Sequence, residues 1–179
     1  MTRVHFRDAA PADVPALVSL VTAAYRGPSS RSGWTTEADL LNGGRITPAL
    51  LHEALEHPDT RLLIAERGGA HVRELIACAQ IVKDGACAEF GLFAVRPWLQ
   101  GHGIGRAVLA EAERIARDEM GLSRMEMSVI DARLELVAWY ERRGYRRTGT
   151  YRPFPYGDER FGIPRRDDLR FAVLGKALG

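Results

Sequence analysis

The stretch that decides the fold is Glu89-Phe-Gly-Leu-Phe-Ala-Val-Arg-Pro-Trp-Leu-Gln-Gly-His-Gly-Ile-Gly-Arg106. Its first half is apolar and predicts a strand, which ends at Arg96 and Pro97 because proline has no N–H for a sheet ladder. A glycine-rich segment follows at 100–105, and the residues after it predict a helix. Glycine lets the backbone approach a ligand, and the first turn of a helix carries free N–H groups and partial positive charge. The order strand, glycine-rich turn and helix therefore predicts a backbone cradle for a phosphate.

Two common phosphate-binding motifs do not fit this stretch. The P-loop requires a lysine after its second glycine, and residues 89–106 contain no lysine. The dinucleotide motif requires Gly-x-Gly-x-x-Gly, but its third glycine would fall on Arg106 or Val108. The pattern that remains is Gln100-x-x-Gly103-x-Gly105. By itself it also fits a turn that only begins a helix.

The rest of the chain predicts a mixed α/β fold. Asp84-Gly85 predicts a tight hairpin, so three successive strands should form an antiparallel meander that ends on the glycine-rich turn. The helix after this turn is long enough to be a crossover, which makes the strands on either side of it parallel neighbours. We expect a mixed, mostly antiparallel, twisted sheet with helices on both faces, and a long polar and aromatic loop at 152–168. The expected strands are 3–8, 61–66, 74–83, 86–95, 124–130, 145–151 and 169–176, and the expected helices are 11–25, 34–41, 47–57, 103–119 and 133–143.

Composition limits the class of protein. The 179 residues are 46% hydrophobic and 27% charged, which is typical of one globular domain, and we expect that domain to span 3–179. A net charge of +2 argues against nucleic-acid binding. Cys78 and Cys87 lie in apolar runs, and no Cys or His spacing suits zinc, so we expect reduced thiols and no metal. The sequence has neither a secretory signal nor a run of about 18 apolar residues, which predicts a cytoplasmic protein without a membrane partner. A homodimer is left open.

Two segments resemble a known family. Phe93-Ala-Val-Arg-Pro-x-x-Gln-Gly-x-Gly-x-Gly105 resembles the acetyl-CoA motif of the GNAT superfamily of N-acetyltransferases. Ala138-Trp-Tyr-Glu-Arg-Arg-Gly-Tyr145 resembles the final helix of that family, which typically reads Ala-x-x-Leu-Tyr-Glu-Lys-x-Gly-Phe. The likeness also includes the order of the elements over nearly the whole chain. One departure is Arg133, which stands where the family often has asparagine, so a cofactor contact from that position is in doubt.

The resemblance implies a cofactor site. In the family, the central parallel strands splay apart and acetyl-CoA binds between them, with its pantetheine arm on the first strand. Its pyrophosphate would lie on the glycine-rich turn, where Arg96 is a further candidate for phosphate contact, and the Phe93 N–H would be an oxyanion donor. The implied cofactor-binding residues are Phe93, Ala94, Val95, Gln100, Gly101, His102, Gly103, Ile104, Gly105 and Arg106.

The resemblance also implies a reaction, the transfer of an acetyl group from acetyl-CoA to a primary amine of a small molecule or peptide. Tyr140 would be the general acid that protonates the departing thiolate, although an ordinary core tyrosine is the alternative. Glu89 would be the base, since a carboxylate among apolar residues can have a raised pKa. A solvated strand residue, a substrate-orienting carboxylate or an ordered water acting as the base are its alternatives. A non-catalytic acyl-CoA-binding sensor is the other reading of the whole chain. The acceptor site would lie under 31–45 and 151–168.

Overall fold

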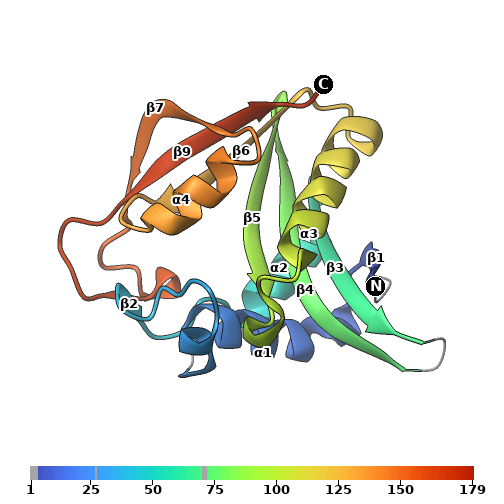
Figure 1. The fold of residues 1–179 in the computed structure, drawn as a ribbon, viewed down its shortest axis with the longest axis horizontal. Coiled ribbons are helices and arrows are strands. Elements are labelled where there is room, and N and C mark those ends of the chain that lie inside the picture. Colours follow the sequence, from blue (N-terminus) through green and yellow to red (C-terminus); the bar gives the residue numbers. More distant parts are fainter. Residues whose placement is uncertain (1–3, 27, 70–71) are drawn as a thin grey trace.

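The computed structural model describes residues 4–26, 28–69 and 72–179. Within these residues, seven strands form one sheet in the order β1-β3-β4-β5-β6-β9-β7, and only β5 and β6 are parallel neighbours (Figure 1). The strands are β1 Val4–Asp8, β3 Thr60–Gly68, β4 Arg73–Asp84, β5 Cys87–Val95, β6 Arg124–Ile130, β7 Arg146–Pro153 and β9 Arg170–Ala177. Arg3, the predicted start of the first strand, lies outside the described residues.

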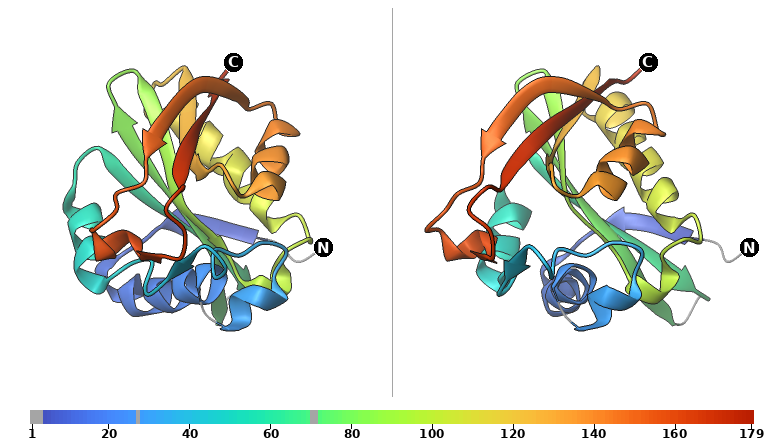
Figure 2. Two further views of the ribbon diagram at one scale, coloured as in Figure 1. Left: turned by 90° about the vertical axis from the view of Figure 1, so that its left-hand side faces the viewer. Right: turned by 60° about the vertical axis from the view of Figure 1, so that its left-hand side comes forward.

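Helices cover both faces of this sheet. α1 (Val14–Tyr25) and α2 (Pro48–Glu56) cover one face, and α3 (Ile104–Arg114) and α4 (Leu134–Glu141) cover the other (Figures 1 and 2). A 3₁₀ turn, Pro11–Asp13, precedes α1, and a π-helical turn, Ile115–Glu119, extends α3. The mixed, mostly antiparallel sheet with one parallel pair and flanking helices confirms the predicted fold class. No helix in the described ranges has the length and apolar character of a membrane span.

The helices form where the local sequence favours them. Thr47 caps α2, because its Oγ1 accepts a hydrogen bond from the Leu50 N–H at 3.3 Å, and Pro48 occupies the first helical position. α1 buries residues at spacings of three and four, including Leu17 and Val21, against the sheet. These helical faces form the two halves of the core on either side of the sheet.

The two central strands diverge after a short pairing. β5 and β6 are in register only at Cys87–Arg124, Ala88–Met125 and Glu89–Glu126. Further along, β5 carries a bulge opposite β4, where its register shifts by one residue. Leu92 in this bulge has a φ of 46°, a conformation that is rare for leucine. A bulge bends its strand, so β5 curves away from β6 and exposes the edge at 93–95.

The predicted helix at 34–41 is wrong. That segment runs through turns into the short strand β2 (Leu41–Asn42). Tertiary contacts override the helical pattern: the Glu37 backbone N–H donates to the Tyr25 carbonyl at 3.2 Å, and the Glu37 side chain turns into the protein interior.

The predicted loop at 152–168 contains more structure than expected. A 3₁₀ turn, Glu159–Phe161, is followed by β8 (Ile163–Pro164), which pairs antiparallel with β2. The two segments lie more than 100 positions apart in the sequence, so no local pattern could indicate this pairing. The small sheet they form joins the two regions that were expected to roof the acceptor site.

Candidate functional site

The glycine-rich turn leads directly into α3. Gly101 and Gly103 have φ values of 82° and 83°, which lie in the left-handed region that favours glycine. Gly103 is the residue before the first turn of α3, so the free N–H groups of that helix face the turn. Gly105 is needed for a different reason: an added Cβ would lie 3.2 Å from Phe93 Cζ and 3.4 Å from Trp139 Cζ2.

A cavity of about 410 Å³ lies beside this turn, between β5 and α4. The splayed edge of β5 forms one wall and α4 forms another, while the end of α1 and the segment after it contribute the rest. Its lining includes Tyr25, Trp34, Phe93, Ala94, Val95, Gln100, Gly101, Gly103, Gly105, Arg106, Arg133, Trp139, Tyr140, Arg142 and Arg143.

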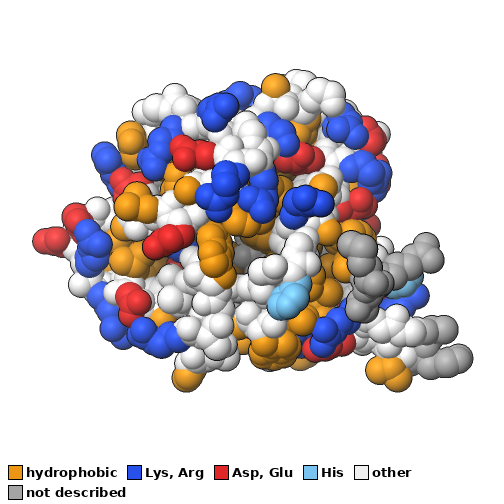
Figure 3. Space-filling model, in the orientation of Figure 1, with side chains coloured by type: hydrophobic (Ala, Val, Ile, Leu, Met, Phe, Trp, Pro, Cys, Tyr) orange, Lys and Arg blue, Asp and Glu red, His pale blue; other side chains and the backbone are white. Residues whose placement is uncertain are grey.

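Four arginines line this cavity, and three of them, Arg106, Arg142 and Arg143, give it a positive charge, because the fourth, Arg133, is paired with Glu37. The Arg143 guanidinium lies 3.5 Å from the centre of the Trp139 ring, and its Nη1 donates to the Trp139 carbonyl at 2.7 Å. Its Nε is buried without a hydrogen-bond partner. Burial lowers the pKa of Arg143, and the nearby Arg142 and Arg106 lower it further. Arg106 and Arg142 form no ion pair with any described residue. Figure 3 shows basic side chains gathered near a hollow on this face, so the site suits an anion.

Tyr140 lies at the inner end of the cavity. Its side chain is 4% exposed and packs edge-on against Trp139, with ring centres 5.1 Å apart. Burial raises the pKa of Tyr140, and the neighbouring Tyr25 raises it further, while Arg133 and Arg143 act in the opposite direction. The phenol is therefore protonated at neutral pH. Its hydroxyl has no hydrogen-bond partner within the described residues, so its proton is free to be donated into the cavity.

Hydrogen bonds hold the splayed edge of β5 in place. The Tyr25 hydroxyl donates to the Phe93 carbonyl, and Gln100 Nε2 donates to the Val95 carbonyl at 3.2 Å. Gln100 Oε1 in turn accepts from the Trp34 N–H at 2.6 Å. The Gln100 side chain thus ties the turn to both β5 and the segment after α1, which makes it a positioning residue for the cavity wall.

Most of the predicted site residues meet at this cavity. The exceptions among the cofactor-binding residues are His102, which is exposed with Nδ1 3.0 Å from the Gln100 carbonyl, and Ile104, which packs on the core. Arg96 points elsewhere, because its Nε donates to the Leu75 carbonyl at 2.8 Å.

Glu89 is the predicted catalytic residue that the structure does not bring to the cavity. It lies where β5 and β6 are still paired, before the strands diverge. Its Oε1 lies 2.9 Å from Arg152 Nη1, and its side chain is 38% exposed. The register of the bulge decides this placement, since the strand opens only beyond Leu92. Of the alternatives, the partly solvated strand residue describes Glu89 best.

A second cavity, of about 90 Å³, lies on the other side of Tyr140. Five residues line both cavities and therefore lie between them: Tyr25, Phe93, Arg133, Leu136 and Tyr140. The second cavity extends under the loops that carry β2 and β8. It therefore lies in the region that the family resemblance implies for the acceptor.

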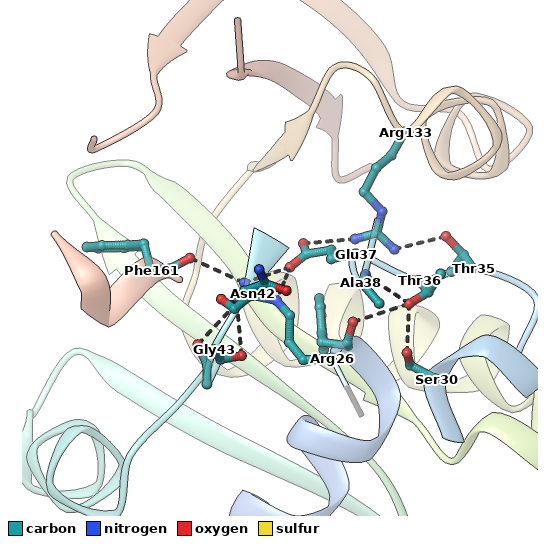
Figure 4. A network of polar contacts seen from close by, with 12 residues as sticks. Arg26, Ser30, Thr35, Thr36, Glu37, Ala38, Asn42, Gly43, Arg133 and Phe161 are labelled. Carbon is teal, nitrogen blue, oxygen red and sulfur yellow. Dashed lines mark hydrogen bonds and ion pairs between the residues drawn. The ribbon is translucent and has the colours of Figure 1, made fainter. Parts of the chain in front are cut away.

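A buried ion network borders the second cavity (Figure 4). Glu37 Oε1 accepts from Arg133 Nη1 at 3.0 Å, and Glu37 Oε2 accepts from Arg26 Nη2 at 3.0 Å. Burial alone would raise the pKa of Glu37, but Arg133, Arg45 and Arg26 together hold it below the usual value. Arg133 Nη2 also donates to Thr35 Oγ1 at 2.9 Å. Glu37 is therefore a carboxylate that neutralises part of a positively charged pocket.

Sequence reasoning missed Tyr25 and Glu37 as site residues. Neither belongs to a motif, and both reach the site through long-range contacts. The sequence did draw attention to Arg133, because this residue stands at the position where the family pattern often has asparagine. In place of the doubtful cofactor contact, its guanidinium connects α4 to Glu37 across the sheet opening.

The ion network should be essential to stability. Glu37→Gln leaves Arg26 and Arg133 without their counter-charge, so the free energy of unfolding should fall by about 3 to 5 kcal/mol at neutral pH. The folded pKa of Glu37 is lowered, so its contribution is complete above the unfolded value of about 4.5 and is lost as the pH falls through the folded pKa. Urea unfolding of both proteins at a series of pH values measures this difference.

The control is Glu56→Gln, a change at an exposed residue of α2 that should have little effect. The difference between wild type and Glu37→Gln should stay constant from neutral pH down to about 5 and narrow below about 4.5. A difference that is small at neutral pH, or that does not narrow in acid, would contradict the assignment of Glu37 as a buried carboxylate.

Comparison with solved structures supports the fold. The ribosomal-protein-S18-alanine N-acetyltransferase from Escherichia coli has 15% identity and a TM-score of 0.68, covering 99% of this chain and 95% of that chain. Spermidine N-acetyltransferase from Vibrio cholerae, in complex with CoA and spermine, has 15% identity and a TM-score of 0.70, with coverages of 98% and 95%. Ribosomal-protein-alanine N-acetyltransferase from Brucella melitensis has 21% identity and a TM-score of 0.70, with coverages of 97% and 99%.

At these identities the solved structures show the fold alone. No curated protein sequence matches the chain. Residues 18–145, however, match the acetyltransferase (GNAT) family, and this match includes the glycine-rich turn, both central strands and α4. The chain therefore belongs to the acetyltransferase (GNAT) family.

Proposed function

We propose that this protein is an N-acetyltransferase that transfers an acetyl group from acetyl-CoA to a primary amine. One observation carries the proposal: Tyr140, protonated and without a hydrogen-bond partner in the described chain, lines both the cavity beside the glycine-rich turn and the cavity behind it. A proton donor at the junction of two cavities suits a reaction between two substrates. Family membership and the CoA complex of the Vibrio cholerae structure support this assignment.

The first cavity fits coenzyme A. Pyrophosphate would bind at the turn formed by Gly101 and Gly103, where the N-terminus of α3 offers free N–H groups. Arg106, Arg142 and Arg143 line the same cavity, and Arg106 and Arg142 form no ion pair with any described residue, so their guanidinium groups are available to phosphate oxygens. The pantetheine arm would follow the open edge of β5. When bound, acetyl-CoA supplies an acetyl group activated as a thioester.

Different residues of the chain have different roles in the transfer. The amine nitrogen forms a bond to the acetyl carbon, the bond between that carbon and sulfur breaks, and the nitrogen loses a proton to water. Tyr140 donates its phenolic proton to the leaving thiolate and is reprotonated from solvent. Phe93 lies in the bulge of β5, outside the register pairs with β4, which supports its N–H as the oxyanion donor. Water, and not Glu89, is the proton acceptor in this proposal.

Coenzyme A should raise the melting temperature, because a ligand that binds only the folded state stabilises it. Gly103→Asp should remove most of this shift, since it places a negative charge where the pyrophosphate binds. The matched control is Gly103→Asn, because asparagine and aspartate tolerate a positive φ similarly and differ in charge. Thermal denaturation with and without coenzyme A measures the shift. Stabilisation by NADH but not by coenzyme A would refute the cofactor assignment.

Tyr140→Phe should lower kcat by roughly 10²-fold or more, because it removes the general acid. The KM for acetyl-CoA should change little, since the ring and its packing on Trp139 remain. Release of thiol from acetyl-CoA across a panel of amines measures the rate. Tyr151→Phe, a change at an exposed tyrosine of β7, is the control and should retain wild-type kcat. Wild-type kcat in Tyr140→Phe would exclude the acid role.

Binding of coenzyme A without amine-dependent thiol release in the wild type would favour the non-catalytic sensor over the enzyme. The thermal and kinetic measurements together therefore distinguish the two functions. Only the enzyme requires the proton of Tyr140.

Glu89→Gln should leave kcat/KM nearly unchanged, because Glu89 lies outside both cavities and pairs with Arg152. The pH profile of the variant should run parallel to that of wild type. Glu126→Gln, at the register partner of Glu89 on β6, is the matched control. A loss at neutral pH that recovers toward the pKa of a free amine, about 10.4, would restore Glu89 as the base.

A further inference from the structure

Resting on the proposed acetyl transfer, we infer that the acceptor is a free amino acid with an apolar side chain, and that Arg45 binds its carboxylate in the second cavity. The inference concerns the specificity of the acceptor site. It depends on the charges of that cavity, on the unpaired guanidinium of Arg45 and on the apolar lining.

The second cavity is the place from which an amine can approach. Acetyl-CoA would occupy the first cavity, so the acceptor must reach the acetyl carbon from the other side of Phe93 and Tyr140. Both of these residues line the second cavity as well. An amine bound there would face the bulge of β5 and the phenol of Tyr140.

The charged residues of the second cavity favour an anion. Its lining contains the guanidinium groups of Arg26, Arg45 and Arg133 and one carboxylate, that of Glu37. Both oxygens of Glu37 already accept hydrogen bonds, Oε1 from Arg133 and Oε2 from Arg26. One carboxylate against three guanidinium groups leaves excess positive charge in a small cavity with a largely apolar lining, where charges interact more strongly than in water.

Arg26 is not the group that binds the ligand. Besides Glu37, its guanidinium donates to the backbone carbonyls of Asn42, Gly43, Gly44 and Phe161 at 3.1 to 3.4 Å. Its side chain is 4% exposed. The hydrogen bonds of Arg26 therefore hold β2 and the 3₁₀ turn of residues 159–161 against the end of α1, and its guanidinium is not available to a ligand.

Arg45 is the guanidinium that remains available. It is half-buried, lines the second cavity, and forms neither a hydrogen bond nor an ion pair with any described residue. Its guanidinium carbon lies 5.3 Å from the centre of the Tyr25 ring. Its charge also lowers the pKa of Glu37 and acts against the burial that raises the pKa of Tyr25. The planar fork of an arginine matches a carboxylate.

A second unused donor lies in the same cavity. Arg133 Nε is buried without a partner, although the residue is 7% exposed and its two terminal nitrogens are engaged. The Ser128 hydroxyl, also in the lining, is likewise buried without a partner. A buried donor with no acceptor costs free energy. These two groups have almost no exposed surface, however, so the half-buried Arg45 is the donor that a carboxylate in the cavity would reach.

The remaining lining is apolar, and several aromatic rings of the cavity come from the C-terminal part of the chain. These side chains would accommodate an apolar side chain of limited size. A polyamine would bring further positive charge to Arg45, and a peptide N-terminus has an amide where a free amino acid has its carboxylate. Besides Phe93 and Leu136, which both cavities share, the apolar residues are Leu41, Phe90, Leu92, Met127, Val129, Ile130, Phe154, Phe161 and Phe171.

Three matched acceptors of a size that suits the cavity test the inference: alanine, alaninamide and ethylamine. They share the amine and the apolar group, and only the first has a carboxylate. With wild-type protein, kcat/KM for alanine should exceed that for the other two by about tenfold or more, in line with a charge-assisted pair. Equal values for all three would overturn the inference and leave acetyl transfer intact.

Arg45→Gln should raise the KM for alanine about tenfold or more with little change in kcat, and it should leave ethylamine unaffected. Arg45→Lys should restore part of the preference, because it restores the charge without the fork. The control is Arg31→Gln, which alters an exposed arginine paired with Asp39 outside this cavity. A preference for alanine that survives in Arg45→Gln would exclude Arg45.

Titration calorimetry in the presence of coenzyme A tests the site without turnover. Wild-type protein should bind alanine, and Arg45→Gln should bind it at least about tenfold more weakly. If coenzyme A and alanine bind but no amine releases thiol, acetyl transfer fails while the carboxylate site stands. If wild-type protein binds alanine no better than ethylamine, the carboxylate site is wrong whatever the activity.

Discussion

The parallel pairing of β5 and β6 stops after three residue pairs, and the functional site depends on that divergence. A strand edge that loses its neighbour must find other partners for its backbone groups. Here Tyr25 and Gln100 satisfy the carbonyls of Phe93 and Val95. The freed edge of β5 forms a wall of the larger cavity, and the space between β5 and β6 becomes the smaller cavity. The bulge at Leu92 sets where the opening begins, and therefore which residues of β5 face it.

The buried network of Arg26, Glu37 and Arg133 holds the surroundings of this opening together. It joins the end of α1, the segment before β2 and the start of α4, which are distant in the sequence. Buried ion pairs add little net stability when complete, but loss of one partner is strongly destabilising. The network therefore specifies one arrangement of these three elements. Of the three arginines in the second cavity, the network engages Arg26 and Arg133, which leaves Arg45 for the proposed ligand.

Positive charge lies on both sides of Tyr140, and the two groups of arginines suit different anions. Arg106, Arg142 and Arg143 stand at the glycine-rich turn, where phosphates would bind, while Arg45 stands in the smaller cavity, where a carboxylate would bind. Neighbouring cations lower the pKa of a phenol, but burial raises that of Tyr140 by more. Its proton is thus retained between two cationic regions, as the proposed acid requires.

The sequence by itself determined the features that depend on neighbouring residues: the strand, the turn at Gly101 and Gly103, and the helix after it, because proline, glycine and apolar spacing act locally. Through the likeness of the α4 sequence to the family pattern, it also predicted Tyr140 as a site residue. Only the tertiary structure decided that Glu89 stays in the paired part of β5, that Glu37 leaves a predicted helix for buried ion pairs, and that β2 pairs with β8. These outcomes depend on a strand bulge and on charges brought together from distant segments, which no local pattern encodes.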